Sequence, residues 1–144
     1  MKPKEFLDQL DDAKIVAAIA SAEQTTSGEI RIYVSHKVRE DAVAAAQARF
    51  IKLGMTQTQQ RNAVLIYFAP RSQQFAIWGD AGVHEKCGQE LWSEVATQMA
   101  PLLKAGRFTE AVIEAVRRVG DALARHFPRR SDDRNELPNK VERD

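Results

Sequence analysis

The sequence has few of the features that mark secreted or membrane-spanning proteins. Its 144 residues include a single cysteine, Cys87, which excludes an internal disulfide and is typical of a reducing compartment. The longest apolar run, AVLIYFA at 63–69, is too short to cross a bilayer. The N-terminal stretch has no continuous apolar segment of the kind a signal peptide needs. These absences predict a cytoplasmic protein without a direct membrane span.

The sequence also has little net charge and lacks several common catalytic, metal-binding and nucleotide-binding motifs. The formal net charge is +1, so no overall field attracts nucleic acid, and we expect no nucleic-acid partner. The chain has no HExxH zinc motif, no GxSxG nucleophile motif and no CxxC pair. The glycines of GDAGVHEKCG match neither a P-loop nor a dinucleotide-binding fingerprint. Whether the protein is an enzyme therefore stays open at this point.

The composition is that of an ordinary globular chain, with 44% hydrophobic and 28% charged residues. A chain of this length buries a core as one domain, which we place at residues 1–128. The remaining segment, 129–144, reads RRSDDRNELPNKVERD and is nearly all polar. We expect it to be a disordered tail, with a short docking segment as the alternative.

Apolar periodicity predicts an alternation of helices and strands. Helices are expected over 6–22, 40–54, 83–103 and 109–127, and strands over 29–35, 63–69 and 75–79. Asp8 and Thr109 are candidate N-caps for the first and last helices. The first strand alternates apolar with polar residues, which predicts one wetter face. AVLIYFA is apolar throughout, which predicts a central strand covered on both sides.

The connections between the strands predict a mixed sheet in a layered α/β domain. A helix joins the first strand to the second, so these two are expected to be parallel. The link from the second strand to the third is short, so that pair is expected to be an antiparallel hairpin. The start of the first strand, the start of the second and the end of the third then lie at one edge of the sheet. Glu29, Arg61, Asn62 and Asp80 converge there.

This cluster suits two kinds of ligand. Glu29, Asp80 and the amide oxygen of Asn62 are hard oxygen ligands of the kind that Ca²⁺ and Mg²⁺ prefer. Arg61, together with the N-terminus of the third helix, suits a phosphate or a carboxylate. Adjacent Arg61 and Asn62 are expected on opposite faces of their strand, so Asn62 is the preferred metal ligand. The alternative is that Asp80 only caps the helix and that Glu29 and Arg61 form a surface ion pair.

Long stretches of the chain resemble the TPM domain family. They are TSGEIRIYV, LGMTQTQQRNAVLIYFAPRSQQFAIWGDAGVHEK and the closing HFP, and the resemblance runs from Phe6 to about Pro128. The family includes a thylakoid lumen phosphatase-like protein, a photosystem II repair factor and a nematode receptor modulator. The resemblance implies a three-layer α/β/α sandwich in which about four helices flank a small mixed sheet.

The resemblance also implies a polar pocket at one end of the sheet, with divalent-cation binding and weak acid phosphatase activity. The matching positions are Glu29, Arg61, Asn62, Asp80, His84 and Glu85. If this pocket is functional, His84 is a candidate proton donor or ligand. The alternative is that His84 is an ordinary surface histidine. Many relatives look exported or membrane-anchored, which this chain does not, and Ala63 stands where relatives often have glycine.

Two functions follow as hypotheses. In the first, Glu29, Asn62 and Asp80 bind Ca²⁺ or Mg²⁺ in a regulatory or interaction module that a partner protein recognises, a membrane-associated partner included. In the second, the same pocket is a weak metal-dependent phosphatase, with Asp80 as metal ligand or base and Arg61 on the phosphate. The first is preferred, because no residue pattern supplies an activated nucleophile with an orienting base.

Overall fold

A four-stranded sheet in the order β3-β2-β1-β4 forms the centre of the molecule. The structure is a computed structural model that describes residues 9–129 and 141–143, apart from the side chains of residues 89 and 90. The strands are β1 (Glu29–Val34), β2 (Ala63–Ala69), β3 (Gln74–Gly79) and β4 (Val141–Arg143). The helices are α2 (Asp12–Glu23), α3 (Ala42–Lys52), α4 (Ala81–Lys104) and α5 (Phe108–His126), with short 3-10 helices η1 (Met55–Gln57) and η2 (Pro70–Ser72).

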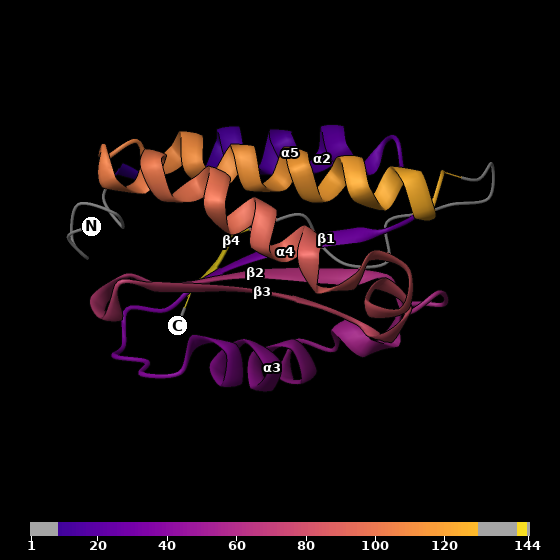
Figure 1. Cartoon of the computed structure of the whole chain (residues 1–144), viewed down its shortest axis with the longest axis horizontal. Coiled ribbons are helices and arrows are strands. Elements are labelled where there is room, and N and C mark those ends of the chain that lie inside the picture. Colours follow the sequence, from indigo (N-terminus) through magenta and orange to yellow (C-terminus); the bar gives the residue numbers. More distant parts are fainter. Residues whose placement is uncertain (1–8, 130–140, 144) are drawn as a thin grey trace.

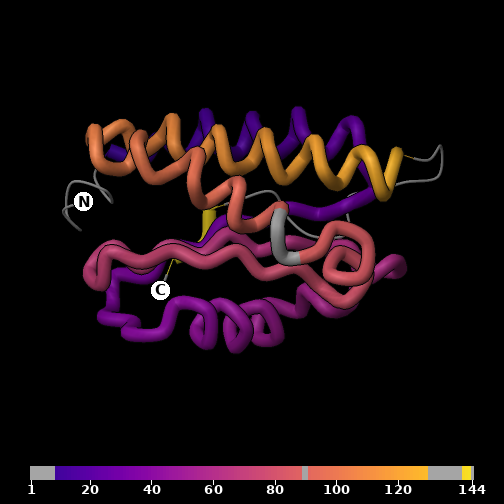
Figure 2. The backbone as a smooth tube through the Cα atoms, viewed as in Figure 1, coloured from indigo at the N-terminus to yellow at the C-terminus, as the bar shows by residue number. Residues whose placement is uncertain are grey.

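The helices lie in two layers, one on each side of the sheet. Figure 1 shows α2, α4 and α5 over one face and α3 alone over the other. The expected three-layer α/β/α sandwich is therefore confirmed. The backbone path in Figure 2 runs from α2 through the sheet to α3, and then returns through β2 and β3 to α4 and α5.

Strand pairing follows the connections. β1 and β2 are parallel, with Ile32 opposite Ile66, and β2 and β3 are antiparallel, with Ile66 opposite Ile77. Both relationships agree with the sequence analysis. The fourth strand, β4, pairs in parallel with the other side of β1, where Val141 lies opposite Ile32. This strand was not predicted as such, and it corresponds to the docking alternative for that part of the tail.

The two faces of the sheet bury different cores. The face under α2, α4 and α5 carries a large aliphatic cluster that includes Ile32, Ile66 and Val116. Cys87 packs at the margin of this cluster, and burial raises the pKa of its thiol, as expected for a core residue. The face under α3 carries a smaller cluster around Phe50.

The polar face of β1 is buried, so the expectation of a wetter face is wrong. All six residues of the strand are buried. Arg31 Nη2 lies 2.7 Å from Glu142 Oε1 of β4 in an ion pair. The Tyr33 ring stacks on Tyr67, with 5.3 Å between ring centroids. A charged partner and an aromatic neighbour thus replace water on this face.

Two helix starts differ from the expected ones. The N-cap of α2 is Asp11, whose carboxylate accepts a hydrogen bond from the Lys14 amide, while the candidate cap Asp8 lies outside the described residues. The Thr109 prediction is wrong, because α5 begins at Phe108 and its cap position is Arg107, two residues before Thr109. The Thr109 hydroxyl instead donates to the Gln9 carbonyl and accepts from the Asp11 amide, which ties α5 to the start of α2.

The division into a domain at 1–128 and a disordered tail at 129–144 stays a prediction for most of the tail, because residues 130–140 and 144 lie outside the described ranges. Within the described part of the chain, no helix has the length and apolar character needed to cross a membrane.

Candidate functional site

The edge of the sheet at which β1 and β2 begin and β3 ends is the candidate site. Glu29 lies opposite Ala63 in the parallel register, and its amide donates to the Asn62 carbonyl at 3.4 Å. The Asp80 amide donates to the Ala63 carbonyl at 2.9 Å. The predicted convergence of the three chain segments is therefore observed. We call the group formed by Glu29, Arg61, Asn62 and Asp80 the corner.

Asp80 is a helix cap and an ion-pair partner at once. Its Oδ1 accepts from the Ala81 amide at 2.8 Å, at the start of α4. Arg61 donates to both carboxylate oxygens, from Nε to Oδ2 at 2.6 Å and from Nη2 to Oδ1 at 2.7 Å. Such a fork is the strongest geometry for an arginine and a carboxylate. These hydrogen bonds raise the pKa of the Arg61 guanidinium.

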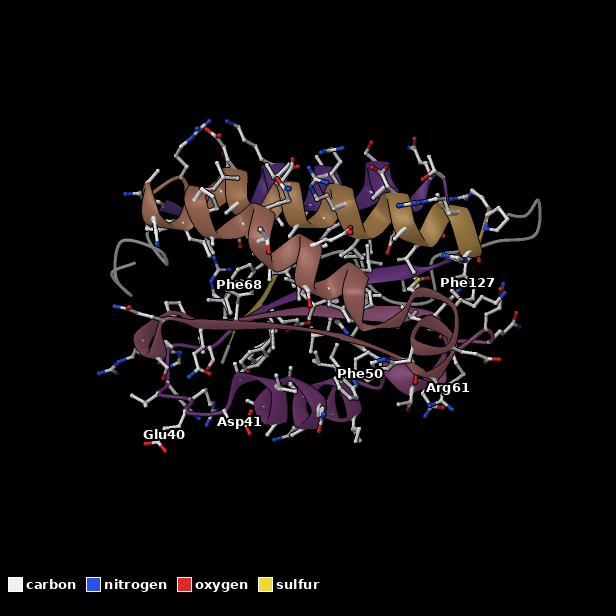
Figure 3. All side chains as sticks on the ribbon, in the orientation of Figure 1. Glu40, Asp41, Phe50, Arg61, Phe68 and Phe127 are labelled. Carbon is white, nitrogen blue, oxygen red and sulfur yellow. The ribbon has the colours of Figure 1, made fainter. Side chains whose placement is uncertain are left out.

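Arg61 differs from its partner in exposure and backbone conformation. Half of its side chain is exposed, at 50%, whereas that of Asp80 is 5% exposed. Its φ of 52° lies in the left-handed region, which residues other than glycine seldom adopt. Figure 3 shows Arg61 at the same end of the molecule as Phe127, at the opposite end from Glu40 and Asp41.

Gly82 allows the loop before β2 to lie against the start of α4. The Gly82 amide donates to the Arg61 carbonyl at 2.9 Å. A Cβ at this position would lie 2.5 Å from the Gln60 carbonyl oxygen and 2.8 Å from that of Arg61. Both contacts are with backbone atoms that a side-chain movement cannot clear. Gly82, the second glycine of the GDAG stretch, is therefore required because the loop backbone lies so close to it, and not because of a ligand.

Asn62 is the most deeply buried polar residue of the corner, at 1% exposure. Its side-chain Nδ2 donates to Ser27 Oγ, and its backbone amide donates to Thr58 Oγ1, both at 3.3 Å. Its Oδ1 is sealed from solvent and has no hydrogen-bond partner in the part of the chain that the structure describes. Ser27 and Thr58 were not singled out in the sequence, because single hydroxyls in the polar stretches TTSGE and QTQQRN have no diagnostic spacing.

Glu29 is 3% exposed and belongs to the face of β1 that α3 covers. Tyr33, two steps of the alternation further along, lies in the α3 cluster, whereas Ile30 lies in the opposite cluster. The Asn62 side chain instead reaches Ser27, in the loop between α2 and β1. The corner thus combines an ion-paired carboxylate at the helix start with two further buried oxygen-bearing residues on the adjoining strand ends.

His84 and Glu85 lie at the beginning of α4 but differ in environment. The His84 ring packs edge-on against Trp78, with 4.8 Å between ring centroids. Its Nε2 is buried, without a hydrogen-bond partner among the described residues. Glu85 is exposed. No hydrogen bond links either side chain to Asp80 or Arg61 in the described structure, so neither is a direct member of the corner.

The fit of a metal to the corner depends on Arg61. Across residues 9–129 and 141–143, no group of three His, Cys, Asp or Glu side chains is arranged to hold a metal ion. The donors at the corner are two carboxylates and one amide oxygen, which is an oxygen set that Ca²⁺ or Mg²⁺ accepts when water completes the coordination. Arg61 already occupies both oxygens of Asp80. An ion that used Asp80 as a ligand would have to displace this guanidinium.

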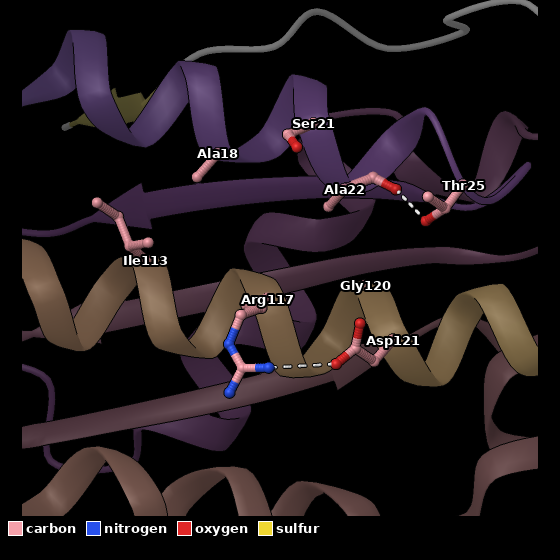
Figure 4. A pocket seen from close by; sticks show the side chains of 8 residues that line it. All are labelled: Ala18, Ser21, Ala22, Thr25, Ile113, Arg117, Gly120 and Asp121. Atoms are coloured by element: carbon pink, nitrogen blue, oxygen red, sulfur yellow. Dashed lines mark hydrogen bonds and ion pairs between the residues drawn. The ribbon is translucent and has the colours of Figure 1, made fainter.

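A hollow of about 320 Å³ lies between α2 and α5, away from the corner. Small residues line it, and Arg117 and Asp121 form an ion pair at its rim, as Figure 4 shows. Arg117 is also bound to Glu114 on the same helix, which raises the pKa of the arginine and lowers that of the glutamate. Its two charged residues are already paired along α5, so this hollow has no unpaired charge to attract an ionic ligand.

Comparison with known proteins gives a family match over most of the chain. A family model described as the TPM domain matches residues 1–122. The solution structure of the BA42 protein from the psychrophilic bacterium Bizionia argentinensis is 33% identical in sequence. It superposes with a TM-score of 0.87, and the match covers 94% of this chain and 96% of that one.

A more distant structure shares the fold. The N-terminal domain of the cg2496 protein from Corynebacterium glutamicum superposes with a TM-score of 0.61 at 14% identity, covering 81% of this chain and 75% of that one. At this identity the likeness concerns the fold alone. No curated protein sequence matches the chain.

Proposed function

The chain belongs to the TPM domain family, and we propose that it is a divalent-cation-binding regulatory module whose cation site is the corner. The observation that carries this proposal is the buried Oδ1 of Asn62, which has no donor among the described residues. Leaving a buried acceptor unsatisfied is unfavourable, and a cation is a partner that a carbonyl oxygen can bind. Glu29 and Asp80 supply the negative charge that a Ca²⁺ or Mg²⁺ ion needs.

In this proposal, regulation follows because the bound cation replaces the Arg61 guanidinium as the partner of Asp80. The guanidinium of Arg61 neutralises Asp80 while the cation is absent. When Ca²⁺ or Mg²⁺ binds Asp80, the arginine is released, and its half-exposed side chain becomes available to a carboxylate on a partner protein. A partner protein can thus distinguish the cation-bound from the cation-free module by the position of the Arg61 side chain. The partner is a protein, membrane-associated or free, and the lone Cys87 favours the cytoplasm as the location.

Titration of Ca²⁺ and Mg²⁺ into ¹⁵N-labelled protein tests the cation site. We expect the amide signals of Glu29, Asn62 and Asp80 to shift at millimolar metal, and Asp80→Asn to abolish the shifts. Asp41→Asn is the matched control, because Asp41 caps α3 with a carboxylate just as Asp80 caps α4. Corner signals that stay still in the wild type, or that move equally in Asp80→Asn, would refute the proposal.

The exchange mechanism makes a separate prediction for Arg61→Gln. Removal of the competing guanidinium is expected to tighten cation binding by about fivefold or more, the lower end of typical coupling between linked sites. The same titration measures the affinity. An unchanged or weaker affinity would show that Arg61 does not compete with the cation, and the regulatory part of the proposal would then be lost while the binding site itself remained.

The phosphatase alternative uses the same residues with Arg61 on the substrate phosphate. It ranks second because both donors of the Arg61 fork are held by Asp80. Hydrolysis of a chromogenic phosphomonoester with added Mg²⁺ tests it, by comparison of the wild type with Asp80→Asn. Turnover that disappears in the variant would favour the enzyme, and equal turnover in both would assign it to a contaminant.

A further inference from the structure

A second polar site lies beside α3, on the face of the sheet opposite α2, α4 and α5. A surface pocket of about 220 Å³ is present there. Its lining residues are Arg39, Ala45, Ala48, Arg49, Lys52 and Tyr67. None of them belongs to the corner, and none is acidic. We call this the basic pocket.

Helix α3 and the loop before it supply the cations of the basic pocket, and β2 supplies its tyrosine. Arg49 and Lys52 are three residues apart in the last turn of α3, a spacing that puts both on one side of the helix. Arg39 comes from the loop between β1 and α3, and its Nε donates to the Tyr67 hydroxyl at 3.3 Å. Tyr67 is a β2 residue and is 1% exposed. Three positive charges therefore surround a buried phenol.

Six arginines of the described structure are bound to carboxylates. The pairs are Arg31–Glu142, Arg61–Asp80, Arg107–Glu110, Arg117–Glu114, Arg118–Glu114 and Arg143–Asp12. Within residues 9–129 and 141–143, neither Arg49 nor Lys52 has such a carboxylate partner. The Arg49 guanidinium lies over the Tyr33 ring, 4.5 Å from its centroid. This contact uses the flat face of the guanidinium and not its N–H edges.

The groups that the pocket presents are donors. Because the Tyr67 oxygen accepts the Arg39 hydrogen bond, its own O–H proton remains to be donated. Stacking of Tyr67 on Tyr33, at an interplanar angle of 10°, fixes the ring at this position. Like charges near one another, such as those of Arg49 and Lys52, repel, and an anion between them converts that repulsion into attraction. The chemistry of the pocket therefore selects an oxyanion.

Size limits the ligand further. At about 220 Å³ the pocket is smaller than the roughly 300–1,000 Å³ sites that hold drug-sized molecules or cofactors. A flat carboxylate is satisfied by one arginine fork, whereas a tetrahedral phosphate accepts donors from several directions. We propose that the basic pocket binds a phosphate group, with Arg39, Arg49 and Lys52 on its oxygens and the Tyr67 hydroxyl as a further donor. This inference does not rest on the proposed cation site.

Titration of inorganic phosphate into ¹⁵N-labelled protein, against sodium chloride at equal ionic strength, tests the proposal. We expect saturable shifts of the amides of Ala45, Ala48 and Tyr67. The double variant Arg49→Gln/Lys52→Gln is expected to weaken phosphate binding by about tenfold or more, because each lost contact is a charge-assisted hydrogen bond. Tyr67→Phe keeps the stacked ring and is expected to give a smaller loss.

A matched control separates this site from general charge effects. Arg125→Gln/Lys104→Gln removes the same two charge types from the last turns of α5 and α4, so it also removes cations that favour helix C-termini. Phosphate affinity is expected to be unchanged in this control. Equal losses in both double variants, or an unaffected Arg49→Gln/Lys52→Gln protein, would overturn the proposal.

The source of the phosphate group is distinguished by a second titrant. Vesicles that contain phosphatidic acid in phosphatidylcholine are compared with phosphatidylcholine alone in a sedimentation assay. Binding of free phosphate without sedimentation assigns a small solute, and sedimentation that requires Arg49 and Lys52 assigns a lipid headgroup. Either result supports phosphate recognition by the pocket, and failure of both titrants refutes it.

Discussion

The two faces of the sheet differ in what covers them and therefore in what they can do. Three helices pack a continuous apolar cluster onto one face, and on the outer surface of α5 Glu114 is paired with Arg117 and Arg118. A single helix covers the other face, which carries Tyr33, Tyr67 and Arg31 within or beside its smaller core. We therefore assign stability mainly to the first face, and the two proposed ligand sites lie on the α3 face and at the adjoining corner.

The largest expected effect comes from truncating matched phenylalanines in the two cores. Phe68 lies in the large cluster and Phe50 in the smaller one, and both are buried. We expect Phe68→Ala to lower the free energy of unfolding by about 4 kcal/mol and Phe50→Ala by about 3 kcal/mol, because α3 can settle into the space more easily than three packed helices. Urea denaturation measures both. A larger loss for Phe50→Ala would contradict the assignment of stability to the first face.

An intermediate effect is expected at two helical glycines. Gly82→Ala forces a Cβ against fixed carbonyl oxygens of the loop before β2, so we expect a loss of about 2–3 kcal/mol. Gly120→Ala, the matched change on the apolar side, brings a Cβ to 2.8 Å from Ala22 Cβ. Its better helix propensity, worth about 1 kcal/mol, offsets part of that clash. Thermal unfolding of both variants tests whether Gly82→Ala is the more destabilising change. Equal losses of stability would mean that the loop before β2 can move away from the new Cβ.

The smallest effect concerns the attachment of β4. Arg143 donates to both oxygens of Asp12 at 2.6 and 2.8 Å, and this hydrogen bonding lowers the pKa of the Asp12 carboxyl. The pair joins β4 to the start of α2. Because both side chains are partly exposed, we expect the pair to contribute only about 0.5 kcal/mol.

The sign of the pH dependence follows from the direction of that shift. A carboxyl whose folded pKa lies below its unfolded value, about 3.9 for Asp, stabilises the fold fully above that value. The stabilisation is lost as the pH falls through the lower folded pKa. The protection factor of the Val141 amide, which is the intrinsic exchange rate at each pH divided by the observed rate, is therefore expected to fall in acid in the wild type. In Asp12→Asn it is expected to be low already at neutral pH. Identical protection in both proteins would show that the pair does not hold β4.

The arrangement of the corner could be predicted from sequence because it depends on strand order alone. One parallel and one antiparallel connection suffice to bring Glu29, Asn62 and Asp80 to the same edge of the sheet. The Arg61–Asp80 fork could not be predicted. It depends on a left-handed backbone conformation at Arg61, which the alternation of strand side chains does not anticipate.

Other features escaped prediction because they depend on distant parts of the chain. The polar alternation of β1 indicates a wet face, but Arg31 is buried because Glu142, more than a hundred residues away, pairs with it. β4 has only three residues, too few for a periodicity to be recognised. The basic pocket was missed for the same reason, since Tyr67 looks like one more apolar residue of a central strand until Arg39 is seen to contact its hydroxyl.

The most direct test uses the amide NMR spectrum of the protein to locate the binding sites of two ligands. Ca²⁺ and inorganic phosphate are titrated separately into ¹⁵N-labelled protein, and the shifted amides are placed on the fold. The account predicts that Ca²⁺ moves the signals of Glu29, Asn62 and Asp80, that phosphate moves those of Ala45, Ala48 and Tyr67, and that the outer surfaces of α2 and α5 respond to neither. Shifts concentrated between α2 and α5, or none with either ligand, would contradict it.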